Sequence, residues 1–457
     1  MEFDSVFPLY QDWEVLSLGE VCRRGGGNVQ TGPFGSQLHA SDYVAEGIPS
    51  VMPQNIGDNR ILDTGIARIT EADAQRLSKY RIREGDIIYS RRGDVERRAL
   101  VREAEDGWLC GTGCLRIRFG KGVIYPRYAA YYLGHPAVRE WIVRHAHGAT
   151  MPNLNTTILS ELPFVLPPWM DQVSIGDAIE LYDQKIDLNR RINQTLEAMA
   201  QAIFKSWFVD FDPVKAKIAA IEQGQDPLRA AMRAISGKTD AELDQMPREH
   251  HDQLVATAAL FPDAMQDSEL GEIPKEWEAK RVGDLIELAY GKALKSNDRK
   301  QGSVPVYGSG GVTGYHNEAL VPHGAIIVGR KGTVGSLYWE DEPFFPIDTT
   351  FYVKPKVLPM TYCFYAMQTL GLDKMNTDAA VPGLNRENVY RLELVKPSIP
   401  ILNAFDGLID QTRKAMRANI IASQSLAELR DSLLPKLLSG ELAIDKIAGL
   451  VDTTGAI

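Results

Sequence analysis

The chain carries the phrase "GDIIYSRRG" at residues 85–93 and a second copy, "GAIIVGRKG", at residues 324–332. Each copy reads glycine, any residue, two isoleucines, two further residues, arginine, a second basic residue and glycine. The apolar part is typical of a buried strand, and the flanking glycines are typical of turns. Each copy closes on a basic pair, which is the less ordinary feature: Arg91-Arg92 and Arg330-Lys331. The recurrence predicts an internal duplication.

The duplication extends far beyond this phrase. "DWEVLSLGEV" around Trp13 matches "EWEAKRVGDL" around Trp277, and "MPNLNTTILSELPFVLPP" from Met151 matches "VPGLNRENVYRLELVKPS" from Val381. The separation of the matched positions falls from 264 (277 − 13) to 230 (381 − 151), while their order is kept. Each half reads as short β-like runs, a short helix-like stretch, a Leu-Asn turn, a proline and one long helix. We therefore expect two similar β-rich domains rather than a solenoid of short repeats.

Each half ends in a long helix with a heptad-like apolar pattern. No proline interrupts residues 172–208, and a helix of that length would extend ~55 Å. Apolar positions recur at steps of four and three, which favours a coiled coil. In the first helix they are Ile175, Ile179, Tyr182, Ile186, Leu196, Met199 and Ile203. In the second helix the seam positions are Phe405, Ile409, Thr412, Met416, Asn419, Ser423, Leu426 and Leu433. The two apolar seams would be buried most simply if the helices packed antiparallel about a pseudo-two-fold axis, with Asn193 equivalent to Asn419.

Length and composition are those of a multidomain globular protein. The chain has 457 residues, of which 44% are hydrophobic, enough for roughly three domains. Its four cysteines are too few and too scattered for a disulfide scaffold, so a cytoplasmic setting is expected. Cys110 and Cys114 have no second pair at zinc-finger spacing, and no metal site is expected. Neither a signal peptide nor a membrane-spanning segment is expected.

The net charge of −10 argues against a nucleic-acid binder until its distribution is considered. Residues 169–275 hold 11 basic and 19 acidic residues, whereas residues 1–168 hold 19 and 20, and residues 276–397 hold 14 and 14. Within the first block, residues 60–102 hold 11 basic and 7 acidic residues. A locally basic face on a neutral domain is compatible with binding to phosphates, and a solvated surface is the alternative.

Several catalytic patterns are missing. The chain has no phosphate-binding G-x-x-x-x-G-K-[ST] loop, no adenine-methyltransferase D/N-P-P-Y motif and no G-x-S-x-G elbow. Asp263, Glu278 and Lys280 imitate a metal-dependent nuclease triad, but residues 264–277 between them are predicted to be a linker rather than a strand hairpin. The residues therefore predict a non-catalytic α+β protein with two β-rich domains and a long helix pair.

Four segments resemble the specificity subunit of type I restriction–modification enzymes. They are "DQKIDLNRRINQTLEAMAQAIFKSWFVDFDPV" from Asp183, "SELGEIPKEW" from Ser268, "DTTFYV" from Asp348 and "LRDSLLPKLLSGEL" from Leu429. The resemblance covers nearly the whole chain in the order of that family. It implies a first target-recognition domain at 1–168, a central helix at 169–212, an acidic helical or linker segment at 213–275, a second recognition domain at 276–397, and a C-terminal helix and tail at 398–457.

The resemblance also implies a function. In that family this subunit has no active site, and each recognition domain reads one half of a bipartite double-stranded DNA target. The helix pair spaces the halves and docks two methyltransferase subunits, and restriction/translocase subunits complete the complex. S-adenosylmethionine, ATP and Mg²⁺ would belong to those partners, and no cofactor is expected in this chain. An alternative is a stand-alone two-headed carbohydrate or peptide binder that uses the aromatic stretches "YAAYYL" (128–133) and "FYAMQ" (364–368).

Candidate DNA contacts follow from side-chain chemistry, because arginine pairs with guanine or phosphate and glutamine with adenine. In the first domain they are Ser36, Gln37, His39, Arg91, Arg92, Arg97 and Arg98. In the second domain they are Lys292, Lys295, Asn297, Arg299, Arg330 and Lys331. The competing interpretation for each is an ordinary surface loop or turn.

Two further groups have alternative roles. Leu154-Asn155 and Leu384-Asn385 are expected to cap or turn into the next element rather than to touch bases. Phe204, Trp207 and Phe208 are expected either to anchor a methyltransferase subunit or to pack against the other helix.

Overall fold

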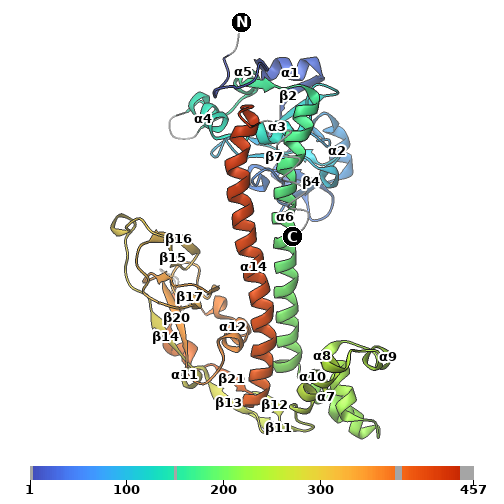
Figure 1. The fold of residues 1–457 in the computed structure, drawn as a ribbon, viewed down its shortest axis with the longest axis vertical. Helices are drawn as coiled ribbons and strands as arrows, with labels where there is room; N and C mark the ends of the chain where they lie inside the picture. The colour runs from blue at the N-terminus through green and yellow to red at the C-terminus, as the bar shows by residue number, and fades with distance from the viewer. Residues whose placement is uncertain (1–3, 149–151, 376–382, 443–457) are drawn as a thin grey trace. The chain divides into compact units, whose positions relative to one another are not determined.

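The structure is a computed structural model that describes residues 4–148, 152–375 and 383–442 (Figure 1). The chain divides into two compact units. Unit 1 comprises Met1–Arg190 and Ile420–Ile457, and unit 2 comprises Arg191–Asn419. The division cuts both long helices, so each unit consists of one β-rich head together with half of each helix.

The head of unit 1 contains one two-stranded and two four-stranded sheets. The pair is β1 (Glu14–Ser17) with β10 (Pro163–Leu166). The first sheet has the order β2 (Gly26–Thr31), β9 (Cys114–Gly120), β6 (Ile87–Ser90), β7 (Arg98–Leu100). The second has the order β3 (Tyr43–Val44), β5 (Ala67–Ile69), β4 (Ile48–Val51), β8 (Leu109–Cys110). The helices are α1 (Leu18–Arg24), α2 (Glu71–Arg76), α3 (Pro126–Tyr132), α4 (Pro136–His145) and α5 (Thr156–Glu161).

The head of unit 2 repeats this plan. Its pair is β13 (Glu278–Arg281) with β21 (Glu393–Lys396). Its four-stranded sheet has the order β14 (Ile286–Tyr290), β20 (Thr350–Pro355), β17 (Ala325–Gly329), β18 (Leu337–Glu340). Its smaller sheet has the order β16 (Gly311–His316), β15 (Val304–Gly308), β19 (Phe345–Pro346). The helices are α11 (Val282–Leu285), α12 (Met360–Gln368) and α13 (Arg386–Tyr390).

The two heads share the order of the four-stranded sheet and of three strands in the smaller sheet, which confirms the predicted duplication; β3 of unit 1 is the additional strand. In both, the opening strand pairs antiparallel with the strand that precedes the long helix. In both, the smaller sheet contains one parallel pair, β4–β8 or β15–β19, beside an antiparallel pair. The repeated phrase forms the inner strands β6 and β17, whose residues are buried throughout. A strand covered on both faces needs an uninterrupted apolar run, which is why the sequence predicted these two buried strands.

The two long helices are α6 (Trp169–Phe208) and α14 (Ile399–Leu438), each of 40 residues, and they pack antiparallel in each unit (Figure 1). In unit 1, Asn189 Nδ2 donates to Ser423 Oγ (3.1 Å), and Asp183 lies opposite Arg430. In unit 2, Asn419 Nδ2 donates to Asn193 Oδ1 (2.9 Å), and Asn193 Nδ2 donates to the Met416 carbonyl (3.0 Å). None of the helices in the described ranges is long and apolar enough to cross a bilayer.

The seam agrees with the predicted pattern except at one position. Ile186, Leu196, Met416, Leu426 and Leu433 are half-buried, as expected for seam residues. Met199 is 53% exposed, and its neighbour Ala200 takes the buried position at 2%. The step from Leu196 to the next seam residue is therefore four rather than three, and the assignment of Met199 to the seam was wrong.

Each head is joined to the helix halves of its own unit through their shared core. In unit 1, Ile175 and Ile179 of α6 and Leu437 of α14 pack with buried Tyr128 and Phe164 of the head. In unit 2, Phe204, Trp207 and Phe208 of α6 pack with Phe405 of α14 and Tyr362 of the head. These three aromatic side chains are only 4%, 2% and 4% exposed. They are core residues of unit 2, which confirms the packing alternative.

The segment between α6 and β13 is mostly helical, which is one of the two alternatives given for residues 213–275. It folds into α7 (Asp212–Glu222), α8 (Pro227–Ser236), α9 (Asp240–Asp244) and α10 (Arg248–Ala259), with a small core of their own. The predicted linker at 264–277 is instead a hairpin of β11 (Met265–Ser268) and β12 (Gly271–Pro274). Gly271 (φ 92°) follows the two turn residues in a left-handed conformation, and Ser268 Oγ donates to the Gly271 carbonyl (2.7 Å). The absence of an apolar alternation concealed this hairpin in the sequence.

We predict that Asn193→Ala destabilises the chain, because it removes both hydrogen bonds through which Asn193 joins the two helices. The expected loss is about 1–2 kcal/mol of the free energy of unfolding. Urea denaturation followed by circular dichroism measures it. Gln194→Ala, at the neighbouring exposed position, is the control. Equal midpoints for the two variants would show that the asparagine contact contributes nothing.

Candidate nucleic-acid interface

The first arginine of each basic pair is held by its backbone in the same way. In unit 1, Arg91 N–H donates to the Gly113 carbonyl (2.9 Å), and the Arg91 carbonyl accepts from Leu154 N–H (2.8 Å). In unit 2, Arg330 N–H donates to the Thr349 carbonyl (2.9 Å), and its carbonyl accepts from Leu384 N–H (2.8 Å). The two arginine side chains therefore leave equivalent, rigid backbone positions.

The closing glycines and the Leu-Asn turns support this frame. Gly93 (φ 74°) and Gly332 (φ 85°) adopt left-handed conformations, which explains why each phrase ends in glycine. Asn155 Oδ1 accepts from Ile158 N–H (2.8 Å), and Asn385 Oδ1 accepts from Glu387 N–H (2.9 Å), so both asparagines are helix N-caps. The predicted capping role of these turns is confirmed.

The basic cluster of unit 1 is smaller than its sequence suggests. Arg92 is exposed, and the guanidinium carbon of half-buried Arg91 lies 5.8 Å from the ring centre of Phe34. Arg97 is exposed and paired with Asp94. Arg98 is only 6% exposed, and its Nε donates to the Ala130 carbonyl (2.8 Å). Arg98 faces the interior from β7 and does not belong to a surface cluster, which corrects the prediction for that residue.

The loop after β2 supplies the other candidates of unit 1. Ser36 and His39 are exposed. Gln37 is half-buried, and its Oε1 accepts from Phe34 N–H (3.1 Å) and from the Tyr80 hydroxyl (2.8 Å). Gln37 therefore shapes the loop with its amide oxygen, while Ser36 and His39 remain available at the surface.

The loop after β14 supplies the candidates of unit 2. Lys292, Lys295, Asn297 and Lys331 are exposed. Arg299 is half-buried, and its Nη1 and Nη2 donate to the carbonyl (2.7 Å) and Oγ1 (3.2 Å) of Thr313. Arg299 thus ties the loop to β16, and the exposed side chains beside it carry most of the loop's free positive charge.

Three residues beside these clusters were not recognised in the sequence. Phe34 (52% exposed) lies against Arg91, and Tyr290 (47% exposed) lies against Arg330, whose guanidinium carbon is 4.9 Å from the Tyr290 ring centre. Arg386 lies 5.0 Å from the same ring. An aromatic residue near the end of the strand that precedes each loop was the available signal. Only the fold places those loops beside the basic pairs.

Cys110 is a buried core residue, and Glu278 and Lys280 lie in a group of ion pairs at the surface. The described parts of the chain contain no group of three His, Cys, Asp or Glu side chains that could hold a metal ion. Burial raises the pKa of the Cys110 thiol to about 12. A hydrogen bond from Lys396 lowers the pKa of Glu278, which also lies 3.8 Å from Lys280. Glu278 and Lys280 thus belong to a surface ion-pair group.

The aromatic stretches that suggested a carbohydrate or peptide binder are interior. Tyr128, Tyr131 and Tyr132 are at most 3% exposed, and Phe364 and Tyr365 are 8% and 2% exposed. A stacking platform for a sugar needs exposed ring faces, and these rings belong to the cores of the two heads.

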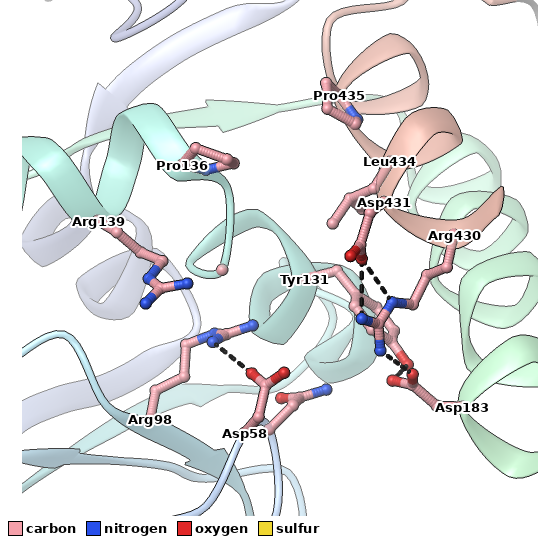
Figure 2. A pocket seen from close by; sticks show the side chains of 12 residues that line it. Asp58, Arg98, Tyr131, Pro136, Arg139, Asp183, Arg430, Asp431, Leu434 and Pro435 are labelled. Atoms are coloured by element: carbon pink, nitrogen blue, oxygen red, sulfur yellow. Dashed lines mark hydrogen bonds and ion pairs between the residues drawn. The ribbon is translucent and has the colours of Figure 1, made fainter. Parts of the chain in front are cut away.

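In unit 1 a charged cavity of about 220 Å³ lies where the head meets the helix pair (Figure 2). Arg430 of α14 donates to Asp183 of α6 (2.5 Å) and pairs with Asp431 (2.8 Å). The Tyr131 hydroxyl of α3 lies 2.7 Å from Asp183 Oδ2, so one carboxylate joins the head to both helices. Arg98 and Asp58 form a second pair across the cavity (3.5 Å). We call this contact between the head and the two helices the joint of unit 1. The positive charges of its arginines are balanced by the negative charges of its aspartates.

Comparison with known proteins identifies the family. The model of the type I restriction modification DNA specificity domain matches residues 10–198 and 274–416. The chain is 29% identical to the type I restriction enzyme HindI specificity subunit of Haemophilus influenzae, over 94% of this chain and 100% of that protein. It is 20% identical to the MjaIX specificity subunit of Methanocaldococcus jannaschii, over 96% and 95%. The crystal structure of the type I S subunit from M. genitalium aligns with a TM-score of 0.51 at 15% identity, over 95% and 99%.

The family model covers well over half of the chain and falls on both duplicated halves. The chain belongs to the family of type I restriction–modification specificity subunits. The match leaves out residues 199–273, which hold the end of α6, the small helical segment and the hairpin.

We predict that Asp183→Ala weakens the joint of unit 1, because it leaves the largely buried Arg430 guanidinium and the Tyr131 hydroxyl without this acceptor. Asp183 and Arg430 side chains are 18% and 21% exposed. Removal of one partner from such a pair costs about 2–4 kcal/mol. Thermal denaturation measures the change, and Glu428→Ala, on the exposed surface of α14, is the control. An unchanged melting temperature for Asp183→Ala would contradict the assignment.

Proposed function

We propose that this specificity subunit reads a bipartite double-stranded DNA target, with one half-site recognised by each head. The observation that carries the proposal is the twofold occurrence of an arginine at an equivalent, backbone-locked position beside a polar loop. Two heads of the same topology present different side chains from this frame, so each suits a different short sequence.

The chemistry of the surface supports contact with a duplex. Arg91, Arg92, Arg330 and Lys331 supply positive charge at the two basic pairs, and the loops after β2 and β14 add polar side chains. Arginine binds guanine O6 and N7 with two hydrogen bonds, and lysine binds phosphates as a point charge. Residues 169–275, in which acidic side chains outnumber basic ones, lie outside the basic clusters. Their net negative charge favours contact with protein rather than with DNA.

The helix pair is the proposed docking surface for two methyltransferase subunits. Besides the seam, α6 carries exposed apolar side chains in both units: Leu181 and Leu188 in unit 1, and Ile192 and Met199 in unit 2. On α14, Leu429 is exposed in unit 1 and Leu408 in unit 2. Spacings of seven residues on α6 place these groups along one helix face, where a partner helix would bury them.

The catalytic work of the complex is assigned to partner subunits. S-adenosylmethionine would serve methyltransferase subunits, and ATP and Mg²⁺ would serve restriction/translocase subunits. The assembly would act on cytoplasmic DNA, a setting compatible with the four buried free cysteines of this chain. In this proposal the specificity subunit supplies recognition and spacing.

We predict that Arg91→Ala with Arg92→Ala weakens DNA binding about 10- to 100-fold, the cost of lost base or phosphate contacts. Gel shift of the subunit co-expressed with its methyltransferase measures binding, and co-purification measures assembly, which should be unchanged. Arg23→Ala with Arg24→Ala, a pair on the surface of α1, is the control. Unaltered affinity of the Arg91/Arg92 variant would remove these residues from the interface.

We predict that the helix pair sets the unread gap between the half-sites. One heptad added to both helices at the Asn193–Asn419 contact lengthens the pair by about 10 Å, equivalent to about three base pairs of DNA. Sequencing of methylated DNA should then show both half-sites unchanged and the gap about three base pairs longer. Methylation at the original spacing would contradict the proposed spacing role.

A further inference from the structure

One exposed tyrosine of unit 2 lies between two arginines. The guanidinium carbons of Arg330 and Arg386 lie 4.9 and 5.0 Å from the ring centre of Tyr290. A second ring supports each arginine: Phe351 at 5.7 Å from Arg330 and Tyr390 at 5.5 Å from Arg386. Tyr290 itself is 47% exposed, so this stack is at the surface. We call it the arginine–tyrosine stack.

The stack arises from three separate segments that the fold brings together. Tyr290 ends β14, Arg330 follows β17, and Arg386 begins α13 directly after its N-cap, Asn385. Each backbone is fixed: Gly291 N–H donates to the Thr350 carbonyl (3.2 Å), and the Arg330 carbonyl accepts from Leu384 N–H. The side chains are therefore preorganised before any ligand binds, which lowers the entropic cost of binding.

The two arginines differ in their remaining hydrogen-bonding capacity. Arg330 Nη1 donates to the Asp348 carbonyl (3.1 Å), so this guanidinium is tied to its own head. Among the described residues, the polar contacts of the Arg386 guanidinium are two long ones of 3.5 Å, from Nη2 and Nε to Glu387 Oε1, besides its two rings. Rings against the face of a guanidinium leave its edge, a planar fork of N–H donors, for a ligand. Arg386 is the better placed of the two to receive one.

The corresponding place in unit 1 is built differently. In unit 2 the strand register pairs Tyr290 with Phe351, and the equivalent pair in unit 1 is Thr31 with Leu115. Asn385 of unit 2 is followed by Arg386, whereas the equivalent Asn155 of unit 1 is followed by Thr156. Unit 1 retains one arginine and one aromatic ring, Arg91 and Phe34, at 5.8 Å. The shared frame thus carries a two-arginine stack in one head and a one-arginine contact in the other.

We propose that Arg386 is a specificity-determining residue that reads a guanine in the half-site bound by unit 2, and that Tyr290 and Arg330 position it. Two coplanar N–H donors match the two major-groove acceptors of guanine, O6 and N7, whereas adenine presents one acceptor and one donor. The exposed side chains of Lys292 and Lys331 could bind a phosphate as well as Arg386 could, and they need no stacking ring to do so. This inference rests on the proposed function and adds the base that one head requires.

The experiment uses the complete methyltransferase complex that contains Arg386→Lys, which keeps the charge and removes the planar fork. Methylated sites are mapped by sequencing, and affinity is measured by gel shift on a wild-type site. We expect one guanine of the unit 2 half-site to become tolerant of other bases, with affinity about 10- to 100-fold lower for the cognate site. The other half-site should stay unchanged, and so should the salt dependence of binding, because the charge is kept.

An atom-level test replaces that guanine with 7-deazaguanine, which lacks the N7 acceptor. The wild-type complex should lose affinity on this DNA, and the Arg386→Lys complex should be insensitive to the change. Tyr290→Leu should also relax the same base, because it removes the ring shared by both arginines. Tyr352→Leu, which removes the ring beside Lys354 (5.5 Å) on the same sheet, is the matched control and should leave the target unchanged.

Two results would overturn the assignment of Arg386. The first is an unrelaxed target in Arg386→Lys with undiminished sensitivity to 7-deazaguanine. The second is uniform weakening on all sequences with a smaller salt slope in Arg386→Ala and no change of target, which would make the residue a phosphate contact. A wild-type complex that methylates no bipartite target would instead refute the proposed function, and this outcome is visible before any variant is made.

Discussion

Apolar side chains at the ends of the two long helices complete the core of each head, and the rest of the structure depends on this packing. Ile175, Ile179 and Leu437 close the core of unit 1, and Phe204, Trp207 and Phe405 close that of unit 2. Because burial of such a side chain contributes about 1.5–3 kcal/mol, a head without its helix halves would lose much of its stability. Each head and the helix halves of its unit therefore form one folded object.

Between these apolar ends the helix seam contains amides as well as apolar side chains. In unit 1 Asn189 donates a hydrogen bond to Ser423, and in unit 2 Asn419 donates one to Asn193, at positions where leucines would bury more apolar area. Polar pairs in a helix seam sacrifice some stability and disfavour other registers, since a shift would bury unpaired amides. The proposed spacing role would benefit from a helix pair with one register, even a less stable one.

The backbone around the basic pair is the same in both heads, whereas the side chains that it presents at the surface differ. Both heads have the same order in the four-stranded sheet, the same backbone hydrogen bonds at Arg91 and Arg330, and the same asparagine N-caps. The side chains that project from this frame differ: Phe34 and one arginine in unit 1, Tyr290 and two arginines in unit 2. Surface side chains can change without loss of core packing, so one topology can serve two targets.

The sequence by itself determined the duplication, the buried strands β6 and β17, the antiparallel helices and the capping turns, because each depends on local periodicity or local backbone chemistry. It did not reveal the hairpin at Met265–Pro274, the burial of Arg98 or the exposure of Met199, and it left open whether Phe204, Trp207 and Phe208 face a partner or the core. It also did not reveal that Tyr290, Arg330 and Arg386 meet. Such facts depend on which face of an element turns inward and on contacts between residues far apart in the chain. Only the tertiary structure decides them, because packing rather than composition settles which polar side chains remain at the surface.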